Sequence, residues 1–278
     1  MPTVIQFDTQ TVRHYDQPTA DTHAVLDYPR PFVAPPRLPH GFSMLNISKD
    51  ANIRAKATVN DITKEKADFH VTSWADTTLY AAIESVLALA PANLQFSTGE
   101  HMRNLLADPN SPASTRVDFD RPFPTPPKVV VFFNYIDLVK AKNWRLKTSA
   151  ADVDAKGFTL NIETWSDTIL YAAQVGWIAY PEDITHILST TVNTHEVRAW
   201  DQPQALQSKS IKFGENVEFW KSPDVFVALN EIDIDYRFNL RVRAYVDDVT
   251  QAGLTWHINT WGDTILYSAG ISIIAFNP

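Results

Sequence analysis

A seven-residue pattern that occurs three times constrains this chain more than any other feature. Each copy combines a tryptophan, an Asp-Thr pair and a tyrosine, and the copies begin at Trp74, Trp165 and Trp261. The tryptophans are 91 and 96 residues apart. This period is far longer than that of a solenoid repeat and matches the size of a small domain. The 278 residues are therefore predicted to form three tandem units, at 1–92, 93–184 and 185–278.

The repeat extends beyond this pattern, and its periodicity predicts β-structure. Val12-Arg13 and Asp16-Gln17-Pro18 of unit 1 match Val197-Arg198 and Asp201-Gln202-Pro203 of unit 3. In unit 2, apolar and β-branched runs are separated by turn residues, and no helical period is sustained. The chain is predicted to be all-β, with three antiparallel six-stranded β-sandwich units. A unit of this size buries its core only marginally, so the units are expected to pack together.

Composition limits the kinds of molecule that this protein is expected to bind and the cellular compartment in which it is expected to occur. The net charge of −8 disfavours nucleic acid, whose phosphates an acidic surface repels. The absence of cysteine excludes disulfides and thiolate metal sites. No apolar run approaches the roughly 18 residues that membrane insertion requires. The segment Met1–Asp8 lacks the features of a secretory signal, so we expect a cytoplasmic protein, or one exported without a signal peptide.

The repeated tryptophan lies on the polar side of its strand pattern. In unit 2, Phe158, Leu160 and Ile162 alternate with polar residues, and Trp165 is in register with the polar set. One interpretation is that the strand kinks and the ring packs in the core or between units. The other is that the ring is an exposed binding platform, which three independent copies on the polar face favour.

Polar residues that accompany the tryptophan suggest a sugar site. Each unit has an Asn-x-Arg triplet, and each has an aspartate in its N-terminal loop. A carboxylate, a guanidinium and an aromatic ring can together bind the hydroxyls and the apolar C–H patch of a pyranose. The aspartate of the repeated pattern is instead expected to make a turn, by bonding backbone N–H groups two residues on. These turn residues are Asp76, Asp167 and Asp263.

Taken together, these patterns resemble the H-type lectin domain. The resemblance rests on Pro-Pro before an apolar strand, Asn-x-Arg, Trp-x-Asp-Thr-x-x-Tyr, and strands such as Val175–Ala179. It covers all three units and implies binding of terminal N-acetylgalactosamine or galactose on glycoconjugates, with no catalysis and no cofactor. The binding residues that it implies are Asp16, Arg54, Trp74 and Tyr80; Asp108, Arg145, Trp165 and Tyr171; and Asp201, Arg241, Trp261 and Tyr267.

The resemblance also implies how the three units are arranged, and this sequence departs from the family pattern at one position. H-type lectins form trimers, so three units in one chain look like an intramolecular pseudo-trimer whose sites lie at contacts between units. Such a multivalent lectin would cross-link or agglutinate cells, and it could associate further. The histidine that follows the tryptophan in snail lectins is replaced here by Ala75, Ser166 and Gly262. Its contacts to the sugar are therefore missing, which puts the preference for the N-acetyl group in question.

Two other functions fit the sequence less well. An enzyme is disfavoured because no catalytic motif is present, and an arginine beside the only site aspartate would lower its pKa rather than make it a general acid. A scaffold without sugar binding would explain the repeat but not the Asp, Arg and Trp set. His70 and His257 lie four residues before their tryptophans, but unit 2 has Asn161 there. Polar packing or a hydrogen bond between units is thus favoured over a metal role.

Overall fold

The structure is a computed structural model that describes residues 2–104, 113–214 and 216–277. This part of the chain is almost entirely β, with two short 3-10 turns, as the sequence predicted. None of its helical segments has the length and apolar character of a membrane span.

Each unit contributes six strands. Unit 1 contains β1 (Thr3–Asp8), the 3-10 turn η1 (Thr9–Thr11), β2 (Asp21–Asp27), β3 (His40–Ile47), β4 (Ile53–Asn60), β5 (Lys66–Thr72) and β6 (Leu79–Ala88). Unit 2 contains β7 (Ser97–Asn104), β8 (Ala113–Asp118), β9 (Lys128–Leu138), β10 (Trp144–Ala151), β11 (Gly157–Glu163) and β12 (Leu170–Tyr180). Unit 3 contains β13 (Ile187–Asn193), η2 (Thr194–Glu196), β14 (Ser208–Lys212), β15 (Asp224–Ile234), β16 (Leu240–Asp247), β17 (Gly253–Asn259) and β18 (Leu266–Phe276).

Within a unit, the strands form two three-stranded antiparallel sheets that pack face to face. In unit 1 the sheets are β1-β6-β3 and β2-β5-β4, and the other units repeat this order. Strands that line the sandwich bury every second residue, as in β17, where Leu254, Trp256 and Ile258 are inside. The period of two in the sequence therefore marks the face of each strand that enters the core.

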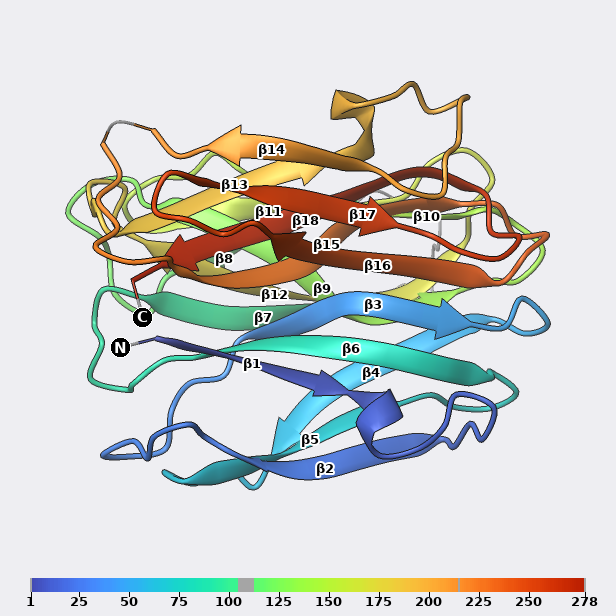
Figure 1. The fold of residues 1–278 in the computed structure, drawn as a ribbon, viewed down its shortest axis with the longest axis horizontal. Coiled ribbons are helices and arrows are strands. Elements are labelled where there is room, and N and C mark those ends of the chain that lie inside the picture. Colours follow the sequence, from blue (N-terminus) through green and yellow to red (C-terminus); the bar gives the residue numbers. More distant parts are fainter. Residues whose placement is uncertain (1, 105–112, 215, 278) are drawn as a thin grey trace.

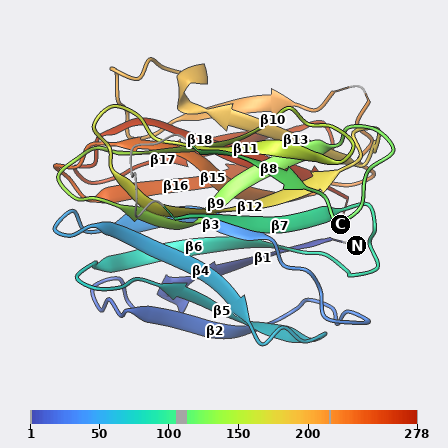
Figure 2. The same cartoon turned by 180° about the vertical axis from the view of Figure 1, so that it is seen from behind.

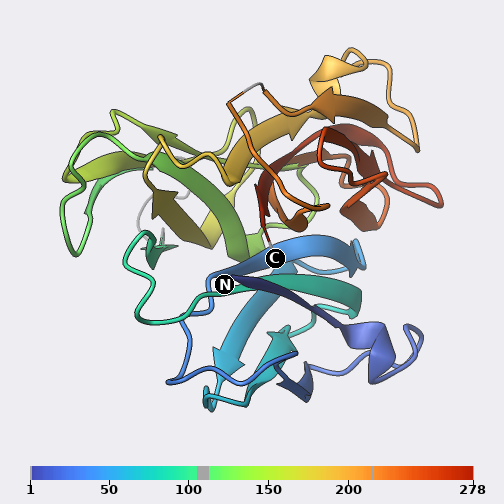
Figure 3. The same ribbon diagram turned by 60° about the vertical axis from the view of Figure 1, so that its left-hand side comes forward.

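Every three-stranded sheet continues into a neighbouring unit. β3 pairs with β16, β15 pairs with β10, and β4 pairs with β9, so that three six-stranded antiparallel sheets result. Each unit thereby pairs with both others, and Figure 3 shows the three lobes around a common centre. The sequence predicted packing between units, and continuous strand pairing is a stronger connection. It also covers strands that would be open edges in a separate unit.

A second apolar core lies where the three units meet. It includes Leu87 of unit 1, Phe132 of unit 2 and Phe226 of unit 3, all fully buried. The rings of Phe132 and Phe226 meet edge to face, with centroids 5.0 Å apart. Gly41 and Gly176 make room for this contact, since a Cβ atom at either position would lie within 2.7 Å of the Phe132 ring. These glycines are explained by close packing rather than by a turn.

One buried carboxyl group lies at the boundary of units 1 and 2. Glu84 on β6 is completely buried, and neither of its carboxyl oxygens has a hydrogen-bond partner among the described residues. The ring of His40 lies nearby, with Nε2 3.9 Å from a carboxyl oxygen of Glu84 and 3.6 Å from one of Glu100. Asn134 lies between His40 and Glu100 and donates a hydrogen bond of 2.6 Å to Glu100. Burial, and secondarily the charge of Glu100, hold the pKa of Glu84 well above its usual value.

Glu84→Gln is expected to stabilise the protein at pH 8 and to have much less effect at pH 5. A raised pKa in the folded state gives stability that is present at low pH and lost as the pH rises through that pKa. The neutral amide does not titrate, so the gain at pH 8 should be about 1.4 kcal/mol for each unit by which burial raises the pKa of Glu84, up to pH 8. Urea unfolding at both pH values measures this. An equal effect at the two pH values would contradict it.

Candidate functional site

The repeated Trp-x-Asp-Thr pattern and the Asn-x-Arg triplet form one hydrogen-bond network in every unit. In unit 1, Nη1 of Arg54 donates to Asp76 at 2.7 Å and to Thr77 at 3.3 Å, and the Thr77 hydroxyl donates to the carbonyl of Asn52. The same contacts recur at Arg145 and Arg241. The hydrogen bond from arginine is the main cause that lowers the pKa of the three aspartates. These residues do shape the turn, but the aspartate partner is the arginine rather than a backbone N–H two residues on.

The asparagine of the triplet connects each unit to the next. The side-chain carbonyl of Asn52 accepts a hydrogen bond from the backbone N–H of Lys140 in unit 2. Asn143 of unit 2 does the same for Tyr236 in unit 3, and Asn239 of unit 3 for Lys49 in unit 1. A residue two positions before each arginine therefore fixes the neighbouring unit against it.

The residue after each tryptophan adopts a left-handed backbone. The φ angles are 55° at Ala75, 57° at Ser166 and 66° at Gly262. This conformation turns the chain sharply and leaves the preceding tryptophan beside the arginine. Only glycine adopts it without a steric cost, so units 1 and 2 accept strain here that unit 3 avoids.

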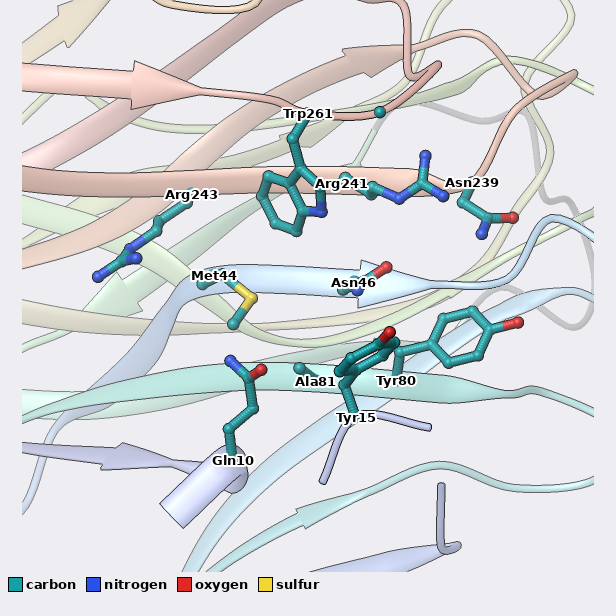
Figure 4. Close-up of a pocket in the computed structure, with 11 residues that line it drawn as sticks. Gln10, Tyr15, Met44, Asn46, Tyr80, Ala81, Asn239, Arg241, Arg243 and Trp261 are labelled. Carbon is teal, nitrogen blue, oxygen red and sulfur yellow. The ribbon is translucent and has the colours of Figure 1, made fainter. Parts of the chain in front are cut away.

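One cleft lies between unit 3 and unit 1, and we call it cleft A. Its volume is about 680 Å³. Unit 3 contributes Trp261 and Arg241, and unit 1 contributes Met44, Asn46 and Tyr80. Figure 4 shows the Trp261 ring reaching from unit 3 toward β3, with Met44 and Asn46 on that strand and Tyr80 beyond it. The other lining residues are Gln10, Tyr15, Ala81, Asn239, Arg243 and Gly262.

A related cleft, cleft B, lies between unit 2 and unit 3. Its volume is about 510 Å³. Trp165 and Arg145 come from unit 2 and occupy the positions of Trp261 and Arg241 in cleft A. Unit 3 contributes Asp233, together with Trp200, which is 61% exposed. The remaining lining residues are Lys147, Ser166, His195, Glu231 and Ser268.

The third boundary, between units 1 and 2, differs and is called junction C. The ring of Trp74 packs against that of Tyr135 from unit 2, with centroids 5.0 Å apart. Tyr135 occupies the β9 position that corresponds to Met44 on β3 and Glu231 on β15. The aromatic face that is free in cleft A is thus covered at this boundary by a side chain of the protein itself.

At each boundary the register places one polar residue opposite the arginine. Arg241 is paired with Asn46, Arg145 with Asp233, and Arg54 with Asp137. Nε of Arg145 lies 3.3 Å from Oδ1 of Asp233, and Nε of Arg54 lies 3.5 Å from Oδ1 of Asp137. In all three polar residues, Oδ1 is buried and lacks a well-aligned hydrogen bond among the described residues.

The acid in cleft B has a raised pKa. Burial raises the pKa of Asp233 to about 6, although Arg145 acts in the opposite direction. The pKa of Asp137 is also raised, mainly by burial. Cleft A has the neutral Asn46 at this position, so the three boundaries share a geometry but differ in charge.

The structure separates the residues that the resemblance grouped within one unit. Arginine and tryptophan come from one unit, and in cleft A the tyrosine comes from the next, since Tyr80 lies with Arg241 and Trp261. Tyr267 lies beside cleft B, where its ring meets that of Trp200 and its hydroxyl donates to Asp235. Tyr171 is the second residue of β12, at junction C, and is partly exposed.

Two of the loop aspartates, Asp16 and Asp201, are not among the residues that line clefts A and B. Asp16 is exposed and lies 2.5 Å from His14, and it is not among the residues that line cleft A. Asp201 is exposed as well and does not line cleft B. The residues just before them, Tyr15 and Trp200, enter the clefts instead. Asp108 lies outside the described residues.

The polar residues that face the arginines from β3, β9 and β15 were not predicted as site residues, although the sequence contains a pattern that marks them. In each unit, Asn46, Asp137 or Asp233 interrupts an apolar strand eight residues before the arginine. A polar residue at one position of three apolar strands indicates a common role. Its partner could not be identified, because the arginine that it faces belongs to a different unit.

Comparison with known proteins identifies the family. The model of the H-type lectin domain matches residues 25–88, 114–180 and 208–276, one segment in each unit. The chain therefore belongs to the H-type lectin family and is a carbohydrate-binding lectin. The comparison with curated proteins found no match.

The left-handed position after the tryptophan gives a test of this local geometry. Gly262→Ala is expected to destabilise the protein by about 1–2 kcal/mol, the cost of a left-handed backbone with a Cβ atom. The new Cβ would also lie 2.8 Å from Nη1 of Arg241, which would have to move. Ser166→Gly, in the equivalent position, should instead stabilise by up to about 1 kcal/mol. Chemical unfolding of both variants measures these changes, and a neutral Gly262→Ala would refute the assignment of strain.

Proposed function

We propose that the protein is a multivalent lectin for terminal galactose or N-acetylgalactosamine, with clefts A and B as its binding sites. The observation that carries this proposal is the meeting of a tryptophan that is at least partly exposed, an arginine and a polar residue of the next unit in both clefts. Galactose has an apolar C–H face that suits an aromatic ring, and its neighbouring hydroxyls suit a guanidinium beside an oxygen acceptor.

The buried oxygens opposite the arginines support the same proposal. Asn46 and Asp233 each contribute an Oδ1 atom without a well-aligned partner, next to the arginine across the boundary. These oxygens are closed to solvent, so a hydroxyl-bearing ligand would complete their hydrogen bonding only if Asn46 or Asp233 turned its side chain into the cleft that it lines. Such groups make a site selective for ligands that offer hydroxyls, because otherwise polar groups remain unsatisfied.

Two open clefts on one rigid body account for cross-linking. A shallow sugar site has a Kd in the millimolar to micromolar range, about −4 to −8 kcal/mol. Linked sites raise avidity for clustered glycans by about 10² to 10⁴ where the geometry allows both to bind. Agglutination of cells that carry such glycans is the expected consequence.

Binding of methyl-galactoside, followed by calorimetry, is expected to give two sites per chain. Trp165→Ala and Trp261→Ala should each remove one site, with a loss of at least about 10-fold in affinity there, and should abolish agglutination while monovalent binding persists. Absence of binding to any sugar of a glycan array, in a folded protein, would favour a scaffold function instead.

Tyr135→Ala is expected to open junction C and to raise the stoichiometry from two to three. The substitution removes the ring that packs on Trp74, while Arg54 and Asp137 keep their positions on paired strands. Trp220→Ala, at an exposed aromatic residue that lines neither cleft, is the control and should leave two sites. A stoichiometry that stays at two in Tyr135→Ala would show that junction C does not contain a latent site.

The two clefts should differ in pH dependence. With Asp233 near pKa 6, its carboxylate is the sugar acceptor above that pH and is lost as the pH falls. In Trp261→Ala, which retains cleft B, affinity at pH 5 should be about one tenth of that at pH 7. In Trp165→Ala, which retains cleft A, Asn46 does not titrate and affinity should change less than about twofold. Sugar titrations of both variants at pH 5 and pH 7 measure these changes. An equal change of affinity in the two variants would contradict the prediction.

A further inference from the structure

Two histidines lie side by side at the outer edge of unit 1. β2 is an edge strand paired with β5, and their register places His23 directly opposite His70 (Figure 1, Figure 2). The imidazole rings are stacked, with centroids 4.8 Å apart and planes within 8° of parallel. The side chain of His23 is 55% exposed and that of His70 is 17% exposed, so the pair is open to solvent on one side.

A carboxylate on β5 faces both rings. Oδ1 of Asp68 lies 3.2 Å from Nδ1 of His23, and Oδ2 lies 3.3 Å from Nε2 of His70. The possible ligand atoms of these three residues all lie within 4.8 Å of one another. In a tetrahedral zinc site with ligands at about 2.0–2.1 Å, neighbouring ligand atoms are separated by about 3.3 Å. Each histidine–aspartate distance is close to that separation, and the two involve different oxygens of Asp68.

A second carboxylate orients one of the rings. Asp21 at the start of β2 lies 3.1–3.2 Å from Nδ1 of His70. A carboxylate accepts a hydrogen bond from this nitrogen, so Nε2 is the nitrogen of His70 that a metal beside Asp68 would bind. Carboxylate–histidine pairs of this kind fix the tautomer of metal ligands and raise their basicity.

We propose that His23, His70 and Asp68 form a binding site for a divalent transition metal of the zinc class, with solvent as the remaining ligand. Two imidazoles and a carboxylate are a ligand set that Zn²⁺ accepts. The metal would join the edge strand β2 to β5. None of these residues lines cleft A or cleft B, so the site is independent of sugar binding.

The other two units contain the same strand pair without this ligand set. At the positions of His70, His23 and Asp68, unit 3 has His257, Ser208 and Thr255, and unit 2 has Asn161, Ser114 and Thr159. His257 instead stacks on Tyr245 and lies 2.8 Å from Asp247. Both His70 and His257 thus find their polar partners within their own unit, rather than across a boundary. Among the described residues, the group in unit 1 is the one that could hold a metal.

Zinc and cobalt titrations of the chelator-treated protein test the site. We expect one Zn²⁺ per chain by competition with a chromogenic chelator, and one Co²⁺ with visible absorption of the intensity found in four- or five-coordinate sites. His70→Asn, which copies unit 2, and His23→Ser, which copies unit 3, should each weaken binding at least 100-fold. Asp21→Asn should weaken it about 10- to 100-fold, as a second-sphere carboxylate does. His257→Asn is the matched control and should leave the affinity unchanged.

A gain of binding keeps the proposal testable if a variant of unit 1 fails to fold. Ser208→His combined with Thr255→Asp builds the same three ligands in unit 3 and should raise the stoichiometry to two. Galactose binding by each variant serves as the check of the fold. Equal zinc affinity of the wild type and His70→Asn, or no zinc bound at micromolar concentration, would overturn the proposal.

Discussion

Strand pairing across the unit boundaries is the constraint on which the rest of the structure depends. β4, β10 and β16 carry the arginines, and each is hydrogen-bonded to a strand of another unit. An antiparallel register fixes which residues are opposite, so an arginine of one unit always meets the same position of the next. The clefts are a consequence of this pairing. A separate unit would have the arginine and tryptophan but not the polar residue that faces them, nor the aromatic residues on the far side.

A common backbone with different side chains explains why the three boundaries differ. The position opposite the arginine is Asn46, Asp233 or Asp137, and the position two residues earlier is Met44, Glu231 or Tyr135. Methionine leaves an apolar floor beneath the tryptophan of cleft A. Glutamate forms an ion pair with Lys147 in cleft B, at 3.0 Å. Tyrosine fills junction C. At each boundary, the residues at these two positions therefore determine whether the cleft is open and what charge its lining carries.

Much of the fold could be predicted from the sequence, and less of the site. The repeat fixed the number of units, and the alternation in strands such as Gly157–Glu163 identified the buried faces, because both depend on local order along the chain. The Asn-x-Arg and Trp-x-Asp-Thr patterns likewise located one side of each cleft. Asn46 and Trp200 could not be assigned, because their partners lie in other units and no local pattern reports which units touch. The loop aspartates Asp16 and Asp201 were assigned by analogy, and their loops turn them toward solvent.

Joining the units in one chain permits features that identical subunits could not share. The buried Glu84 corresponds in the register to Val175 of unit 2 and Ile271 of unit 3, so the carboxyl occurs at one boundary only. With identical subunits, every boundary would carry this uncompensated buried acid, and the cost of burial would be incurred three times. The same reasoning applies to Phe132, which fills the space left by Gly41 of one unit and Gly176 of its own. Three phenylalanines and no glycine at these positions would not fit. Covalent linkage thus allows the centre to be packed by unlike residues, and once the centre is asymmetric the three boundaries are free to acquire different side chains.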